Sequence, residues 1–283
     1  MSFARRQEQI LAMKAASAPA SGGGHTRTAA ADRPAAASAP PQPAGNTPAA
    51  RAAATIAMRL RHDIQRLRQI KSVERKVAAK REMLPEYRAW CDGLLDAGRA
   101  VTGNTLEPTG ADDVLPTIMV WHLDVGDWWR ALDLAAIALR FAIPMPSRYE
   151  RDAATLVLEL IADAALKAQA RSDVFPLDVL EAVEVLTDGI DMHDQPRAKL
   201  LKAIGAELVR AAGMSTGDAI VPTIDRAAAA LTRAQDLHDR VGVKTMLRGL
   251  DRARAAAIKG AAETHVPENR NSDPVSTHDG EDE

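Results

Sequence analysis

Apolar side chains recur every three or four positions along most of residues 51–263. This is the spacing of amphipathic helices, and it differs from the strict alternation of half-buried strands. Short segments rich in proline, glycine or aspartate interrupt the pattern and mark the ends of successive helices. We therefore predict an all-α fold. Beyond Pro85 the pattern predicts helices over residues 85–98, 114–125, 128–142, 148–170, 177–189, 196–213, 219–237 and 241–263.

The connections between these predicted helices are short, which favours an array of antiparallel helical hairpins. Residues 126–139 and 217–231 share a Gly-Asp start and an alanine-rich middle. Small side chains let helices pack closely, as they do in tetratricopeptide-type repeats, although the period here is irregular. We predict a tetratricopeptide-like array of hairpins over residues 85–263.

The segment before this array is predicted to form one long helix over residues 51–84. No proline or glycine lies between Pro48 and Pro85. The apolar stripe is narrow and close to the coiled-coil period, so the helix needs a partner from another copy or from the following domain. The stripe consists of Leu60, Ile64, Leu67, Ile70, Val73 and Val77.

Both ends of the chain lack the composition of a packed domain. Residues 15–50 are almost entirely alanine, proline, serine and glycine with small polar residues, and nothing there can offset the entropy lost on ordering. We predict a disordered N-terminal tail over residues 1–50, with a short helix near Phe3–Met13. We also predict a disordered acidic tail over residues 264–283.

The formal net charge of −2 conceals a strong segregation of charge. Residues 51–81 carry ten Lys and Arg against two acidic residues, a net charge of +8. Residues 263–283 carry seven acidic residues against one arginine, a net charge of −6. This pattern indicates a polyanionic partner near one end and a different partner near the other. The alternative is a solvated helix and a solubilising tail.

Cys91 is the chain's single cysteine, which excludes an intramolecular disulfide and suits a reducing cytosol. No apolar run approaches the ~18 residues of a membrane span. The N-terminal apolar stretch is broken by Glu8 and Lys14, so it makes a poor signal peptide. We expect a cytoplasmic protein that has no contact with a membrane.

Candidate catalytic chemistry is sparse. Neither SGGGHT nor TGNTLEPTG has the Lys and Ser/Thr that complete a phosphate-binding loop. Cys91 is most simply a small core residue, and His122 has no partner at a spacing that suits catalysis. The run DGIDMHD, residues 188–194, does not fit a calcium loop and lies where aspartates end and cap helices. We expect no catalytic residue, no metal and no cofactor in this chain.

Three of the four tryptophans lie within residues 119–135. Gly126 is predicted to end one helix in the left-handed conformation, and Asp127 to cap the next. Trp128 shares a predicted core stripe with residues 132 and 135. Trp129 falls on a neighbouring face and is a candidate partner contact, because exposed aromatic side chains are frequent interface hot spots.

Four segments of this chain resemble a known family: residues 80–95, 114–146, 197–208 and 242–252. The most specific motif is WHLDVGDWWRAL, followed by MP. Over roughly residues 71–253 the chain is similar to the terminase small subunit of P2-like tailed phages, the GpM type. The resemblance implies an oligomer that recognises the packaging site on phage DNA and recruits the large subunit, which carries the ATPase and the nuclease. It also implies a place in the bacterial host cytoplasm, during phage assembly or from a prophage.

We therefore expect a non-catalytic subunit of a terminase endonuclease complex, with phage DNA and the large subunit as partners. The basic helix could neutralise phosphates, which would make DNA binding strongly dependent on salt. The alternative is a helical-repeat adaptor that binds only proteins, in which the basic helix serves oligomerisation. The predicted DNA-binding residues are Arg59, Arg61, Arg66, Arg68, Lys71, Arg75, Lys76, Lys80 and Arg81.

Overall fold

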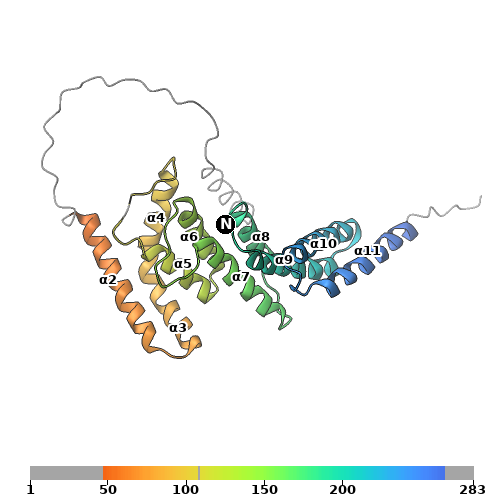
Figure 1. Ribbon diagram of the computed structural model, residues 1–283, viewed down its shortest axis with the longest axis horizontal. Coiled ribbons are helices and arrows are strands. Elements are labelled where there is room, and N and C mark those ends of the chain that lie inside the picture. Colours follow the sequence, from red (N-terminus) through yellow and green to blue (C-terminus); the bar gives the residue numbers. More distant parts are fainter. Residues whose placement is uncertain (1–46, 108, 265–283) are drawn as a thin grey trace, which may run out of the picture.

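The computed structural model describes residues 47–107 and 109–264, and within them it contains helices and no strand. The prediction of an all-α fold is confirmed, whereas the likeness to tetratricopeptide repeats stays a prediction. The helices form an elongated array that runs from α2 at one end to α11 at the other (Figure 1). They are α2 (Pro48–Gln69), α3 (Val73–Met83), α4 (Arg88–Ala100), α5 (Val114–Val125), α6 (Trp128–Arg140), α7 (Ala153–Gln169), α8 (Leu177–Thr187), α9 (Asp194–Met214), α10 (Ile220–Leu237) and α11 (Lys244–Thr264), with short 3-10 turns at Leu84–Tyr87 and Gly217–Ala219.

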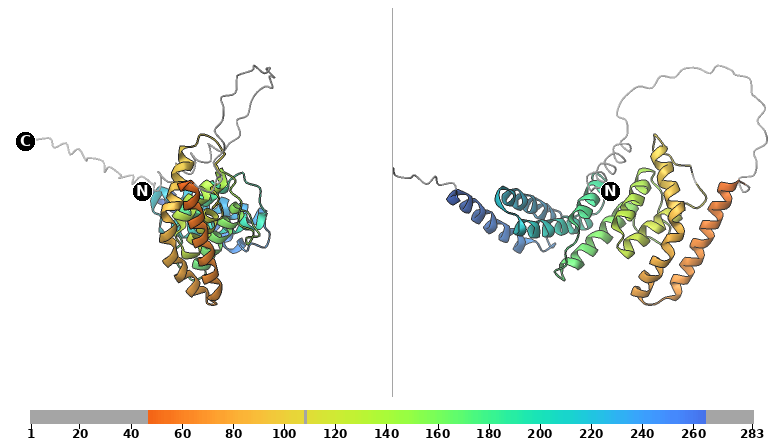
Figure 2. Two further views of the ribbon diagram at one scale, coloured as in Figure 1. Left: turned by 90° about the vertical axis from the view of Figure 1, so that its left-hand side faces the viewer. Right: turned by 180° about the vertical axis from the view of Figure 1, so that it is seen from behind.

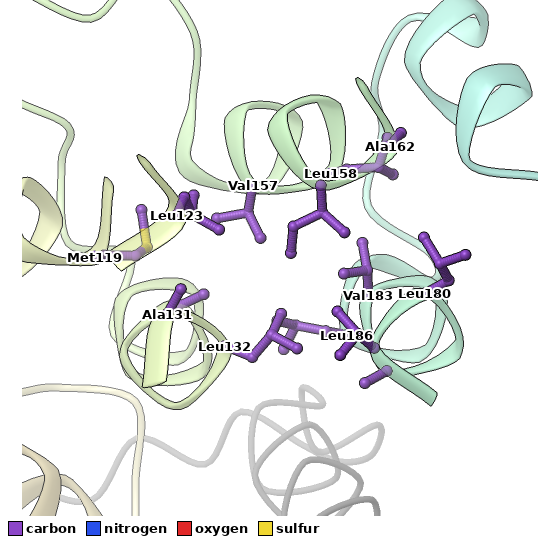
Figure 3. Packing of buried hydrophobic residues seen from close by; sticks show 14 of the residues in the cluster. Met119, Leu123, Ala131, Leu132, Val157, Leu158, Ala162, Leu180, Val183 and Leu186 are labelled. Atoms are coloured by element: carbon purple, nitrogen blue, oxygen red, sulfur yellow. The ribbon is translucent and has the colours of Figure 1, made fainter. Parts of the chain in front are cut away.

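The centre of the core lies where α5, α6, α7 and α8 meet (Figure 3). Leu132 of α6, Leu158 of α7 and Val183 of α8 are fully buried there. Along α5, every residue from Val114 to Trp121 is buried, because this helix is apolar on more than one side and is packed between neighbours. With so few aromatic residues, the core depends on aliphatic side chains and alanine, as the composition predicts.

The hairpin of α9 and α10 packs through small residues. Gly205 of α9 faces Leu231 of α10, and a Cβ atom at Gly205 would overlap the Leu231 side chain. Ala227 and Ala234 of α10 are fully buried as well. Because these positions carry little or no side chain, the two helices can approach closely and bury a nearly continuous face.

The prediction of one long helix over residues 51–84 is wrong. The first helix already begins at Pro48, where the Thr47 hydroxyl accepts from the N–H of residue 50, and it ends at Gln69. Ile70 then adopts an extended conformation, with φ −86° and ψ 121°. The hydroxyl of Ser72 accepts a hydrogen bond from the Arg75 N–H at 3.3 Å and caps a second helix, α3. A serine at the N-cap favours this restart, because it satisfies a backbone donor that an interrupted helix leaves free.

The break lets α3 fold back along α2, so the apolar stripe packs against helices of the same chain. Leu60 and Leu67 of α2 are buried together with Met83 at the end of α3. Val73, which the stripe also includes, is 76% exposed. The stripe is therefore covered by the following helices for most of its length.

A buried polar contact fixes α2 against the rest of the molecule. The Tyr87 hydroxyl donates a hydrogen bond to Asp63 of α2 at 2.8 Å, and the Tyr87 ring meets Trp121 edge to face at 5.8 Å. Burial and the neighbouring Asp63 carboxylate raise the pKa of Tyr87, so the hydroxyl keeps its proton and remains a donor. The predicted N-terminal and acidic C-terminal tails lie outside the described residues, apart from the few that α2 and α11 include.

Candidate nucleic-acid interface

The two helices α2 and α3 form a hairpin at one end of the molecule, joined by the turn at residues 70–72 (Figure 2). We call residues 59–81 of this unit the basic hairpin. All nine predicted DNA-binding residues lie in it, and the structure separates them into two groups. The charged side chains of five make no ion pair or hydrogen bond with any other residue the structure describes. These five are Arg61, Arg68, Lys71, Arg75 and Lys76.

The five unpaired cations follow the hairpin from one helix to the other. Arg61 and Arg68 are seven residues apart, so they lie on the same side of α2, roughly 10 Å from each other along its axis. Lys71 lies in the turn and Arg75 in the first turn of α3. Cations spaced along a protruding hairpin can meet several phosphates of a duplex at once, because a duplex carries one charge per ~1.7 Å of its axis.

The other four predicted residues have partners inside the chain. Arg59 forms an ion pair with Glu86, and Arg66 lies 3.6 Å from Glu82. Lys80 and Arg81 connect α3 to the end of α5. These contacts give the four residues a part in holding the hairpin in place.

The contact of α3 with α5 is the better sheltered of these. The Lys80 side chain is only 16% exposed, and its ammonium lies 2.5 Å from the carboxylate of Asp124. The Arg81 guanidinium donates to the backbone carbonyl of Val125 at 3.2 Å. A cation near the last carbonyls of a helix interacts favourably with its dipole, so both side chains stabilise the end of α5.

The corner between α5 and α6 follows the sequence prediction in its backbone. Gly126 has φ +81°, and its N–H bonds back to the carbonyls of His122 and Leu123, which ends α5. The prediction that Asp127 caps α6 with its side chain is wrong. Asp127 stands at the N-cap position, but its carboxylate accepts from Nδ1 of His122 at 3.0 Å and bonds no backbone N–H of α6.

Trp128 and Trp129 are both partly buried in the corner, which limits the surface that either offers to a partner. The Trp128 ring is half-buried against Phe175, with the ring centroids 5.4 Å apart. Trp129 is also half-buried and packs against the core. Its role as a partner contact stays a prediction, with only part of its ring accessible.

The corner brings Asp127 to His122, a contact that was not expected from the sequence. The absence of a catalytic role for His122 stays a prediction. Cys91, His122 and Asp127 line one cavity, but burial raises the pKa of the Cys91 thiol to about 12. A thiol with so high a pKa is not a nucleophile near neutral pH. The core position predicted for Cys91 is confirmed.

The run at residues 188–194 lies at the junction of α8 and α9, and Asp188 ends α8, as predicted. The prediction that an aspartate of this run caps the next helix is wrong, because His193 stands at the N-cap, no side chain caps α9, and Asp194 is already its first residue. Across the part of the chain that the structure describes, no three His, Cys, Asp or Glu side chains gather closely enough to hold a metal ion. Nor is any helix there both long and apolar enough to cross a membrane.

Comparison with known proteins bears on the identity of the chain. The family model of the phage small terminase subunit matches residues 57–195, from the middle of α2 to the start of α9. A protein of Escherichia phage P2, named "Terminase, endonuclease subunit", is 35% identical over 195 residues, which cover 69% of this chain and 71% of that protein. The chain belongs to the phage small terminase subunit family. The match confirms the resemblance seen in the sequence, while no solved structure matches the chain.

The family match includes all of the basic hairpin of this small terminase subunit, together with the corner between α5 and α6. The cations of the hairpin were predictable from the high density of Lys and Arg in this segment of the sequence. Which of these cations are paired was not predictable, because only the fold brings the partners Glu82, Glu86 and Asp124 close to them.

Proposed function

We propose that this small terminase subunit binds phage DNA at the packaging site through the basic hairpin and recruits the large, ATPase- and nuclease-bearing subunit to it. The observation that carries the proposal is the set of five unpaired cations on a hairpin within the family-matched segment. Side chains without an internal partner are available for phosphates, and neutralising phosphates supplies nearly all of the non-specific affinity of a protein for duplex DNA and a large share of its specific affinity.

The division of labour between the subunits is part of the proposal. The P2 relative carries the word endonuclease in its name. We assign to this chain the recognition half of such a complex, with cleavage left to the large subunit. Metal-dependent cleavage of phage DNA by the purified chain alone would contradict this assignment.

The DNA-binding claim is tested with two matched variants of the full chain. The first changes Arg61, Arg68, Lys71 and Arg75 to Gln. The second, a control, removes the same charge from four exposed cations of the distal helices and loops: Arg171, Arg233, Arg240 and Lys244. Losing several phosphate contacts should weaken binding to DNA that contains the packaging region by at least about tenfold at low salt, and the control should bind like the wild type.

The alternative, an adaptor that binds only proteins, gives a different result in the same experiment. A groove between α8, α9 and α10, lined by Leu201, Ile204 and Leu208 with Glu181 and Arg226 beside them, offers a surface for such a partner. If the wild type does not bind DNA, or if the hairpin variant binds as the control does, the adaptor reading is favoured.

Oligomerisation and recruitment of the large subunit belong to the same proposal. The mass of the intact assembly, measured for the chain alone and with the large subunit, tests both. We expect an oligomer that forms a stable complex with the large subunit, and a monomer that does not associate with it would contradict the proposed role.

A further inference from the structure

A second cationic feature lies beside the basic hairpin, at the junction of α3, α4, α5 and α6. It is a cavity of about 420 Å³. Three of these helices each contribute an arginine to its wall: Arg81 from α3, Arg88 from the first turn of α4, and Arg130 from the first turn of α6. None of the five unpaired cations of the hairpin lines it.

The carboxylates of the cavity do not balance its cations. Asp92 is paired with Arg130 at 2.5 Å, and Asp127 contacts His122 at 3.0 Å. Arg81 donates only to a backbone carbonyl, and among the residues that the structure describes Arg88 has no ion pair or side-chain hydrogen bond. Neither Arg81 nor Arg88 has a carboxylate of its own. With His122 neutral near pH 7, because burial lowers its pKa, three guanidinium groups and two carboxylates leave the lining with one net positive charge.

The rest of the lining is apolar. Leu84 and Ile118 are buried, and Pro85 and Val125 complete the surface between the arginines. A single phosphate would leave most of this space empty. A ligand that joins an anionic group to a flat, largely apolar group would use both parts of the lining, and the volume falls in the range of about 300–1,000 Å³ typical of small-ligand sites.

We propose that this cavity binds a nucleotide, with the phosphate on Arg81 and Arg88 and the sugar and base against the apolar lining. Guanidinium groups match phosphate oxygens because their N–H donors form a planar fork. The nucleotide is either the 5′-phosphorylated end of a DNA strand or a free mononucleotide. Arg81 is the last residue of the basic hairpin, but none of the five unpaired cations lines the cavity, so binding here does not require DNA bound to those cations.

The first test is calorimetric titration of the full chain with deoxyadenosine 5′-monophosphate and, separately, with deoxyadenosine. We expect the monophosphate to bind and the nucleoside to bind far more weakly. Arg88→Gln should weaken binding of the monophosphate by about tenfold, because a charge-assisted contact to phosphate is lost. Arg99→Gln is the matched control on the same helix: Arg99 is exposed, pairs with Asp96 and does not line the cavity.

Cys91 gives a second readout in the unmodified protein. It lines the cavity and is the only cysteine in the chain, so a thiol reagent reports on this place alone. Because the thiol is 1% exposed and unreactive while it is buried, the reagent labels it only when the surrounding helices open transiently, and a ligand bound in the cavity opposes that opening. Saturating monophosphate should slow its labelling in the wild type and in Arg99→Gln. The proposal is overturned if the monophosphate does not bind at millimolar concentration, if Arg88→Gln binds it as the wild type does, or if labelling of Cys91 is unaffected.

Competition distinguishes the two sources of the nucleotide. An oligonucleotide with a 5′-phosphate that displaces the monophosphate better than its 5′-hydroxyl counterpart supports a DNA end as the ligand. Displacement by free mononucleotides alone, still dependent on Arg88, supports a free nucleotide. The variant of Arg61, Arg68, Lys71 and Arg75 leaves every residue of the cavity unchanged, and Arg88 lies outside the basic hairpin. Failure of this site and failure of DNA binding by the hairpin are therefore separable.

Discussion

At the scale of single residues, the corner between α5 and α6 couples packing to protonation. Burial lowers the pKa of the His122 imidazole, and the adjacent Asp127 carboxylate opposes this effect only in part. The folded protein therefore holds this proton less tightly than the unfolded chain does. The resulting contribution to stability is complete above the unfolded pKa of about 6.5 and is lost as the pH falls below it.

This coupling predicts how a His122→Gln variant behaves. The free energy of unfolding of the wild type should fall as the pH decreases from about 7.5 to about 5.5, and the variant should show a shallower fall. Chemical denaturation at several pH values measures both. His62→Gln is the control, because the His62 side chain is 79% exposed, and it should keep the wild-type dependence. Parallel profiles for wild type and His122→Gln would rule out the proposed role of His122.

The same corner illustrates what a sequence can and cannot reveal about a site. Gly126 was predictable because a helix that ends with a left-handed residue strongly favours glycine. The contact between His122 and Asp127 was not, since it joins residues five positions apart across a change of chain direction. The cavity beside them draws Arg81, Arg88 and Arg130 from three helices, and no spacing rule connects these positions.

At the scale of elements, the break between α2 and α3 depends on Ser72. Removing its hydroxyl leaves the Arg75 N–H, in the first turn of α3, without its side-chain partner. Ser72→Ala should therefore lower the free energy of unfolding by about 1 kcal/mol, measured by chemical denaturation. Ser147→Ala, in the exposed loop between α6 and α7, should change it little. An equal effect of the two substitutions would argue against the cap.

The hairpin of α9 and α10 supports a second prediction. At Gly205 an added methyl group meets the Leu231 side chain in a closely packed interface. Gly205→Ala should lower stability by about 1–3 kcal/mol through overpacking, despite the better helix propensity of alanine.

A matched control for this change lies in α4. Gly93 is exposed, and a Cβ atom there would meet nothing within 4 Å. Gly93→Ala should raise the free energy of unfolding by about 0.5–1 kcal/mol, because only propensity and the entropy of the unfolded chain change. If Gly205→Ala is stabilising to the same degree, the two helices are not as close as the structure has them.

The helices after Pro85 were largely predictable, because their apolar faces and their boundary residues agree. Residues 114–125 form α5 as predicted, and α10 and α11 differ from the predicted ranges by a few residues. The predicted start of α7 at residue 148 was too early: Asp152 accepts from the Thr155 N–H at 2.9 Å and begins the helix at Ala153. The prediction of a single long helix was wrong because the apolar stripe continues in register across residues 70–72. Its periodicity does not reveal that Ser72 caps a new helix there and that the chain folds back on itself.

At the scale of the whole molecule, the position of the basic hairpin in the array matters for its proposed role. The basic hairpin stands at one end of an elongated array, and the C-terminal helix α11 stands at the other (Figure 1). Such an arrangement can hold DNA at one end and leave the remaining helices free for other partners. In an oligomer, repeated hairpins would place several weak phosphate contacts on one duplex and raise the total affinity.

The dependence of DNA binding on salt tests the central claim most directly. The logarithm of the association constant should fall linearly with the logarithm of the salt concentration, with a slope of about −0.9 for each phosphate neutralised. Neutralising Arg61, Arg68, Lys71 and Arg75 should therefore make the slope shallower by about three to four for each chain that contacts the DNA. The matched variant of Arg171, Arg233, Arg240 and Lys244 should keep the wild-type slope. The same slope for all three proteins would show that the basic hairpin is not the DNA-binding surface.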